Sequence, residues 1–152
     1  MIPTCRKSWS SPLFLAIVSL ILGLKTLPMQ AQTRFYSPIP LGTNNDISDT
    51  LTVNDIPTGE GGFARDYQVQ LEAGDQVAID LVSEEFDSVL LLLASDGSTV
   101  AENDDGPDGS TNSLLFARIN ENGKYIIRVR AFGETGGGKF TLKVSRLRPV
   151  KK

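Results

Sequence analysis

The stretch Phe86–Gly109 reads FDSVLLLLASDGSTVAENDDGPDG. Its Val89–Leu93 run is apolar on both faces, which is typical of a central strand that is covered on both sides. A buried helix is the alternative, but the seven residues Ser88–Ala94 are too few for one. The following Asp96-Gly97 pair favours a hairpin turn, so a short second strand is expected over Thr99–Glu102. The stretch therefore predicts a β-hairpin inside an all-β fold.

The rest of the chain repeats this pattern. From Ile47 onward, short runs rich in Val, Ile, Leu, Phe and Tyr recur at intervals of roughly ten residues, separated by Gly, Asp and Asn clusters. In Asp66–Leu71, polar and apolar residues alternate, so one face of the strand is expected to be buried and the other solvated. Eight strands are expected: Ile47–Val53, Asp66–Leu71, Gln76–Ser83, Ser88–Ala94, Thr99–Glu102, Asn112–Ile119, Lys124–Ala131 and Lys139–Ser145. The predicted fold is an all-β, two-sheet antiparallel β-sandwich in a jelly-roll-like order, which buries such faces and limits exposed edges.

The N-terminal residues have the pattern of a signal peptide. Arg6 and Lys7 form a basic region, Leu13–Leu24 is apolar, and a cleavage site is expected after Ala31. Twelve apolar residues are short for a membrane-spanning helix, which needs about 20; an uncleaved N-terminal anchor is the alternative. We therefore expect a signal peptide at 1–31, an extended lead-in at 32–44, the sandwich domain at 45–146 and a basic tail at 147–152. The expected location is periplasmic or secreted.

Composition limits the chemistry of the mature chain. Cleavage would leave 121 residues, enough for one domain, and would remove the only Cys and the only Trp. The chain contains no His, and removal of three basic residues changes its formal net charge from −3 to −6. Residues 32–112 carry a net charge of −14 and residues 113–152 a net charge of +8. We expect these charges to neutralise each other across the fold, and no nucleic-acid binding is expected.

Oxygen-bearing side chains are concentrated in the loop after Thr99–Glu102. Asn103, Asp104, Asp105 and Asp108 span six positions, and Asp87 begins the neighbouring strand. Calcium takes six to eight oxygen ligands, so these five residues are a candidate calcium site, although the spacing is not that of an EF-hand. The alternative is that they only make turns, because Asp and Asn accept backbone hydrogen bonds and suit left-handed backbone geometry.

Basic side chains form a second candidate. Arg128, Arg130 and Lys143 are expected to point outward from neighbouring strands, where they could bind an anionic polysaccharide, lipid headgroups or an acidic protein. The alternative is a solvated sheet face that is balanced by carboxylates. The aromatic residues are mostly assigned to the core, which leaves little basis for a sugar-binding platform: Phe63, Tyr67, Phe86, Phe116, Tyr125 and Phe140.

No catalytic set is apparent in the sequence. Without His, a Ser-His-Asp mechanism is excluded. A Ser-Lys pair or a pair of carboxylates is compatible with the composition, but no motif places either in a cleft. We therefore expect no enzymatic activity.

The order of these segments resembles the bacterial pre-peptidase C-terminal domain family. The resemblance covers about residues 45–145 and is carried by RDYQVQLEAG (65–74), DQVAIDL (75–81), FDSVLLLL (86–93), AENDDGPDG (101–109), NGKYIIRV (122–129) and GKFTLKV (138–144). It implies a β-sandwich module of the kind commonly attached to secreted proteases, with calcium sites in some related domains. One departure is that family members usually accompany a catalytic domain, and none is expected in this chain.

The predicted function is that of an exported, non-catalytic accessory module. It would bind an extracytoplasmic protein, such as a protease, or a polysaccharide, and Ca²⁺ is the only cofactor considered. The alternative function is a folding or export escort for a separately encoded secreted protease.

Overall fold

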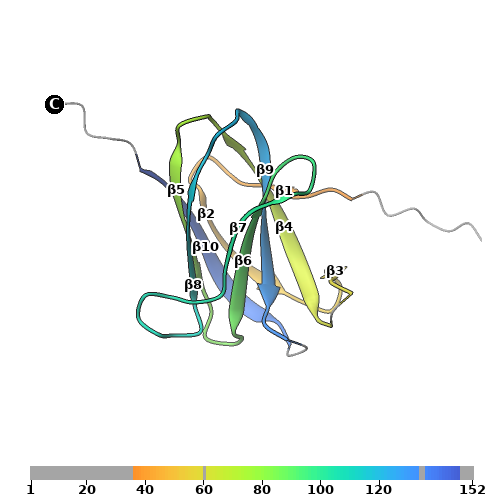
Figure 1. Ribbon diagram of the computed structural model, residues 1–152. Helices are drawn as coiled ribbons and strands as arrows, with labels where there is room; N and C mark the ends of the chain where they lie inside the picture. Colours follow the sequence, from red (N-terminus) through yellow and green to blue (C-terminus); the bar gives the residue numbers. More distant parts are fainter. Residues whose placement is uncertain (1–35, 60, 134–135, 148–152) are drawn as a thin grey trace, which may run out of the picture. The chain divides into compact units, whose positions relative to one another are not determined.

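The computed structural model describes residues 36–59, 61–133 and 136–147. These residues form ten β-strands (Figure 1): β1 (Ile39–Pro40), β2 (Asp46–Leu51), β3 (Ile56–Pro57), β4 (Phe63–Leu71), β5 (Gln76–Val82), β6 (Ser88–Leu93), β7 (Thr99–Asn103), β8 (Ser113–Arg118), β9 (Gly123–Ala131) and β10 (Gly138–Leu147). All eight strands expected from the sequence are present. In this part of the chain no helix is long and apolar enough to cross a membrane. The predicted signal peptide at 1–31 lies outside the described residues, as does the basic tail after Leu147.

The strands form two sheets packed face to face. Sheet A has the order β1-β4-β9-β6-β7, with β3 also paired to β4, and sheet B has the order β2-β10-β5-β8. Successive long strands alternate between the sheets from β2 to β6, and from β7 to β10. This order, β2-β10-β5-β8 facing β4-β9-β6-β7, is that of a jelly roll. The predicted fold class is therefore confirmed.

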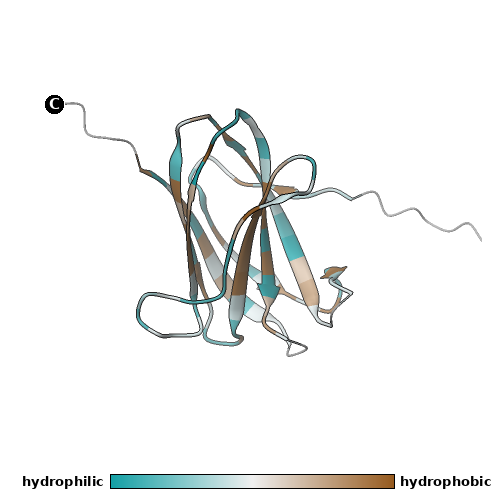
Figure 2. Ribbon diagram, viewed as in Figure 1, coloured by the Kyte–Doolittle hydropathy of each residue, from teal (hydrophilic) through white to brown (hydrophobic). Residues whose placement is uncertain are grey.

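Strand β6 is central because it pairs with β9 on one side and β7 on the other. Apolar residues run along it, whereas β4 and β9 alternate between apolar and polar residues (Figure 2). Leu90 and Leu92, which face sheet B, have no exposed surface, and the outward Val89 is only 2% exposed. Leu91, also outward, is half-buried. A continuous apolar run is therefore tolerated here because its inner face is buried and its outer face is largely covered.

Alternating residues from both sheets form one core. Sheet A contributes Tyr67, Val69, Leu90 and Ile127, and sheet B contributes Ile79, Leu81, Leu115, Leu142 and Val144. The rings of Tyr67 and Phe86 pack edge-on against Phe140, with centroids 6.3 and 6.2 Å away. Burial of each of these side chains stabilises the folded state by about 1.5–3 kcal/mol relative to leaving the side chain exposed. This core holds the two sheets rigid and fixes the positions of their outer faces.

Two short strands were not expected from the sequence. β1 lies in the predicted lead-in and pairs parallel with β4, through Ile39 opposite Tyr67, so sheet A is not purely antiparallel. β3 pairs with the other end of β4. Each is two residues long and ends in Pro, which lacks a backbone donor and therefore resists further strand pairing. Together they pair with four of the nine residues of β4.

Candidate functional site

The predicted calcium residues lie at one end of the sandwich, in and around the loop from β7 to β8. Asn103 ends β7, and its side-chain amide donates to the carbonyls of Asp105 and Leu114 at 2.8 Å. Asp108 accepts hydrogen bonds from the hydroxyl of Ser110 at 2.6 Å and from its backbone N–H at 3.1 Å. These bonds, the hydroxyl first, lower the pKa of Asp108 below its ordinary value. Asn103 and Asp108 thus stabilise the loop as turn residues.

Within the described residues, no group of three or more acidic, His or Cys side chains is arranged to hold a metal ion. Asp104, Asp105 and Asp108 are exposed, and Asp87 is half-buried at the entry to β6. A calcium ion would require the loop to rearrange so that these carboxylates converge. Calcium binding at Asp87, Asn103, Asp104, Asp105 and Asp108 stays a prediction.

The predicted basic stripe on neighbouring strands is wrong. Arg128 and Arg130 lie on β9 in sheet A, whereas Lys143 lies on β10 in sheet B, so the two groups project from opposite outer faces of the sandwich. The prediction assumed that two strands adjacent in the sequence lie side by side in one sheet. The jelly-roll connection from β9 to β10 instead crosses from one sheet to the other. The three side chains therefore form no common surface.

Arg128 is instead part of an ion pair on the outer face of sheet A. Its Nε and Nη2 donate to the two carboxylate oxygens of Asp66 at 2.8 and 2.7 Å. The Tyr36 hydroxyl donates to Asp66 Oδ2 at 2.5 Å. Burial, followed by this bond to the carboxylate, raises the pKa of Tyr36 to about 12. Asp66 was expected to be solvated, but its side chain is only 1% exposed, because these two residues cover it.

The second arginine of β9 is also paired. Arg130 Nη2 lies 3.0 Å from Glu102 Oε1 on β7. Register places Asp66, Arg128, Leu91 and Glu102 side by side across four strands. The charges on the outer face of sheet A therefore compensate one another, as expected from the balance of charge along the chain.

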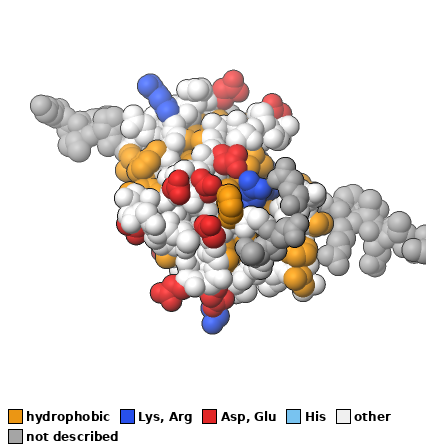
Figure 3. All heavy atoms as spheres, turned by 60° about the horizontal axis from the view of Figure 1, so that its bottom comes forward, with side chains coloured by type: hydrophobic (Ala, Val, Ile, Leu, Met, Phe, Trp, Pro, Cys, Tyr) orange, Lys and Arg blue, Asp and Glu red, His pale blue; other side chains and the backbone are white. Residues whose placement is uncertain are grey.

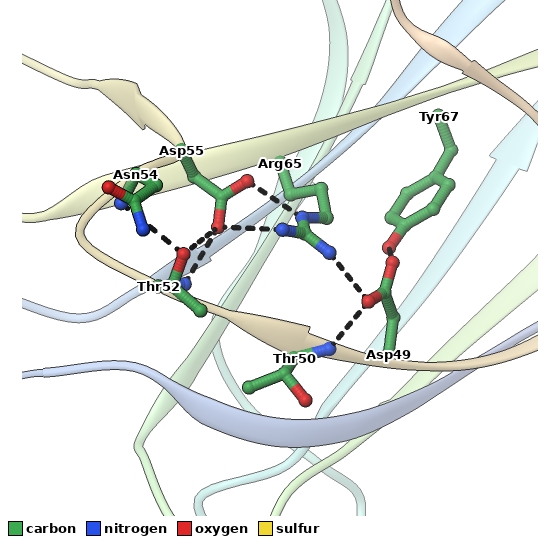
Figure 4. Close-up of polar contacts among 7 residues, drawn as sticks. All are labelled: Asp49, Thr50, Thr52, Asn54, Asp55, Arg65 and Tyr67. Atoms are coloured by element: carbon green, nitrogen blue, oxygen red, sulfur yellow. Dashed lines mark hydrogen bonds and ion pairs between the residues drawn. The ribbon is translucent and has the colours of Figure 1, made fainter.

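A polar cluster connects the two sheets at their β2/β4 edge (Figure 4). Arg65 on β4 donates from Nε and Nη2 to Asp55 at 2.8 and 3.0 Å, and from Nη1 to Asp49 at 2.5 Å. Tyr67 donates its hydroxyl to Asp49 Oδ2 at 2.8 Å. Burial opposes ionisation of Asp49, but bonds from the Thr50 N–H, Arg65 and Tyr67 outweigh it and lower the pKa of Asp49. These side chains hold one another, so their role is to join β2 to β4.

The outer face of sheet B is different, because it is hollowed. A row of short side chains crosses it: Ser48 on β2 lies opposite Thr141 on β10, which lies opposite Val82 on β5. Longer side chains stand on both sides of this row. Lys139, Glu84 and Glu85 line the hollow on one side of the row. On the other side, beyond its lining, Asp46, Lys143 and Asp80 are in register. The result is an open groove of about 620 Å³, called the trough here.

One wall of the trough is held firmly in place. Ser83 donates its hydroxyl to the Lys139 carbonyl at 2.9 Å and accepts from the backbone N–H groups of Glu85 and Phe86. Glu85 Oε2 in turn accepts from the Lys139 backbone N–H at 2.9 Å. The β5–β6 loop is therefore fixed to β10 by hydrogen bonds, and the trough is preformed.

Exposed apolar side chains lie on the same face of sheet B. Phe116 is 63% exposed and lies opposite Ala78 on β5, and Leu147 is 46% exposed. A smaller hollow of about 220 Å³ lies between them. The assignment of Phe116 to the core is wrong: Leu114 and Leu115 are adjacent, so either alternation fits β8, and packing buries Leu115 instead.

Acidic side chains are spread over the end of the sandwich that carries the loops β5–β6 and β7–β8 (Figure 3). Below, this part of the surface is called the acidic end. Its carboxylates are Glu84, Glu85, Asp87, Asp104, Asp105 and Asp108. Among the described residues none of these six forms an ion pair, so they give this end a negative potential.

Comparison with known proteins agrees with this fold. Residues 64–131 match the family model described as the bacterial pre-peptidase C-terminal domain. The predicted resemblance is confirmed. The match runs from β4 to the end of β9, so it includes all of sheet A except its two short edge strands. No curated protein matches the chain.

Solved structures of similar fold include a collagenase domain and a lysozyme inhibitor. The pre-peptidase C-terminal domain of collagenase from Bacillus anthracis aligns with a TM-score of 0.54 and 16% identity, covering 72% of this chain and 95% of that domain. PliG from Aeromonas hydrophila, a periplasmic lysozyme inhibitor of g-type lysozyme, aligns with a TM-score of 0.53 and 15% identity, covering 73% of this chain and 96% of that protein. At this level of identity the similarity establishes the fold.

Proposed function

We propose that this chain is an exported, non-catalytic β-sandwich module that binds an extracytoplasmic protein. The observation that carries the proposal is the difference between the two outer faces. On sheet A, Arg128 and Arg130 are paired with carboxylates, which leaves a charge-compensated surface. Sheet B presents a preformed trough with exposed apolar side chains nearby, and such hollows are where ligands and partners bind.

A binding role is favoured over catalysis by what the polar side chains do. Asp49, Asp55 and Asp66 are paired with arginines that hold strands together, so they are poor acids or bases for a substrate. The chain also lacks His, the commonest general base. The carboxylates of Glu84 and Glu85 at the trough and of Asp104, Asp105 and Asp108 in the β7–β8 loop are exposed, so water screens them.

The comparisons support export and a protein partner. Pre-peptidase C-terminal domains are bacterial modules, and PliG is a periplasmic protein that inhibits another protein. The predicted signal peptide at 1–31 agrees with such a location. A polysaccharide ligand is less favoured, because the trough has no exposed aromatic ring on which a sugar could stack: Phe140, its one aromatic lining residue, is 3% exposed.

Co-purification tests the proposal. The full chain with a C-terminal tag is expressed in its native host, and the periplasmic and secreted fractions are passed over an affinity matrix. Recovery of a protein in stoichiometric amount would support the proposed binding function. If that protein is a protease, the result would indicate the alternative function of a folding or export escort. Recovery of the chain without a protein partner, or only with cell-wall polymer, would refute it. Retention of the chain in the cytoplasm would refute export.

A further inference from the structure

The trough has a chemical character that selects its occupant. Its floor carries the hydroxyls of Ser48 and Thr141, which accept hydrogen bonds, and Thr50 stands beside them. Glu84, Glu85 and Lys139 line the trough. Asp46, Asp80 and Lys143 do not line it but lie in the next outward-facing row of sheet B, two positions along the strands from Ser48, Val82 and Thr141. The surroundings of the trough are therefore negative as well as rich in acceptors.

The two lysines do not cancel this charge. Lys143 lies between Asp46 and Asp80 in register, so the charge of one lysine faces two carboxylates. Lys139 lies beside Glu84 and Glu85, and Glu84 is exposed and makes no ion pair with a described residue. The carboxylates of the acidic end include Glu84 and, in the β7–β8 loop, Asp104, Asp105 and Asp108, so the negative potential extends beyond the trough.

The shape of the trough also limits its occupant. It crosses three strands, β2, β10 and β5, and is open to solvent along its length, so an extended segment can enter it sideways. A volume of about 620 Å³ lies within the range of about 300–1,000 Å³ that is usual for ligand sites, and it admits a few side chains rather than a folded surface. The β5–β6 loop on one side of the trough is held to β10 through Ser83. Little conformational entropy of this loop is therefore lost when a segment binds.

We propose that the trough docks an extended, Lys- or Arg-bearing segment of a partner protein. The cationic side chains of that segment lie among the carboxylates of Glu84, Glu85, Asp46 and Asp80. The hydroxyls of Ser48 and Thr141 accept hydrogen bonds from the N–H groups of the same segment. Exposed Val82 contacts the aliphatic stems of the same side chains, as is usual for Lys and Arg on apolar surfaces. This inference rests on the proposed function and names the surface and partner chemistry through which it acts.

The test uses two probes, a fluorescent decalysine peptide and the neutral oligosaccharide maltohexaose. Binding of the purified protein is measured by fluorescence anisotropy and by nuclear magnetic resonance shift mapping, at about 50 mM salt, where exposed charges are less screened. Decalysine is expected to bind and to perturb the amides of Ser48, Thr141, Val82 and Glu84. Perturbation confined to the β7–β8 loop, or binding of maltohexaose in place of decalysine, would overturn the proposal.

Matched variants separate the trough from general charge attraction. Thr141→Trp fills the floor without changing charge, and Glu84→Lys reverses one wall charge; each is expected to weaken decalysine binding about tenfold. Their controls are Thr99→Trp on exposed β7 and Glu121→Lys in the loop before β9, which are expected to change binding by less than about twofold. Equal weakening by Glu84→Lys and Glu121→Lys would show that only net charge matters. Thermal melts establish that each variant is folded.

The same variants distinguish the two proposals. If the wild-type chain recovers no partner in the native host, the proposed function fails. If Thr141→Trp recovers the same partner in the same amount as the wild type, the trough proposal fails and the binding function stands.

Discussion

Substitution of Arg65 by Met tests whether the polar cluster at the β2/β4 edge joins the two sheets. Arg65 makes three charged hydrogen bonds, two to Asp55 and one to Asp49. Removing one partner of a buried ion pair costs about 3–5 kcal/mol, because it leaves an uncompensated charge. Here the side chains of Arg65, Asp55 and Asp49 are 19%, 12% and 30% exposed, so water compensates part of the loss. We expect the variant to lose about 2–3 kcal/mol of unfolding free energy.

Urea unfolding followed by circular dichroism measures this loss, and the midpoint of thermal unfolding is expected to fall by roughly 10 °C. Arg118→Met, on the exposed face of β8, is the control and is expected to change stability by less than about 0.5 kcal/mol. Combination of Arg65→Met with Asp55→Asn is expected to show a coupling energy of about 1 kcal/mol or more. A loss below about 0.5 kcal/mol, or strict additivity, would refute the reasoning.

The pH dependence of the unfolding free energy tests the same cluster, because the direction of the change with pH follows from the pKa of Asp49. Because the pKa of Asp49 is lowered in the folded state, its carboxylate contributes stability above its ordinary pKa of about 3.9. That contribution is lost as pH falls through the lowered value. The stability difference between wild type and Arg65→Met should therefore be constant near neutral pH and shrink below about pH 4. A difference that grows on acidification would contradict this assignment.

Three further predictions concern other parts of the fold. Gly137→Ala should destabilise by about 1–3 kcal/mol in urea melts, because its Cβ would lie 2.3 Å from the Leu51 carbonyl oxygen, whereas Gly42→Ala has open space and should be neutral. Arg128→Met should cost about 2–4 kcal/mol, since it leaves the buried carboxylate of Asp66 without its cation; an unchanged midpoint would show that Tyr36 and water suffice. If the acidic loop binds calcium, about 2 mM CaCl₂ should raise the midpoint of thermal unfolding in a chelator-reversible way, and no rise would end the calcium hypothesis.

The strands and their pairing class could be read from the sequence because they depend on local pattern. Alternating runs such as Lys124–Ala131 and the continuous run Val89–Leu93 each specify which faces are buried, and Gly- and Asp-rich turns separate them. β1 and β3 were missed because two residues carry no periodicity. They pair with β4 only because its edge is already in place.

The site residues depended on information that the sequence does not carry locally. Asp66 and Arg128 are 62 positions apart, and only their register on β4 and β9 makes them partners. Likewise Arg128, Arg130 and Lys143 seemed to share a surface until the crossing from β9 to β10 separated them. The trough arises from Ser48, Thr141 and Val82, which are unremarkable in the sequence and become adjacent through strand pairing.

By itself, the sequence determined the all-β class, the family resemblance and the concentration of acid before residue 113, because side-chain period and turn chemistry act over a few residues. Only the tertiary structure decided which charges are paired, which outer face is hollowed and that Phe116 points to solvent. Those properties depend on which strands become neighbours, and strand order is set by burial of the whole core rather than by any one segment.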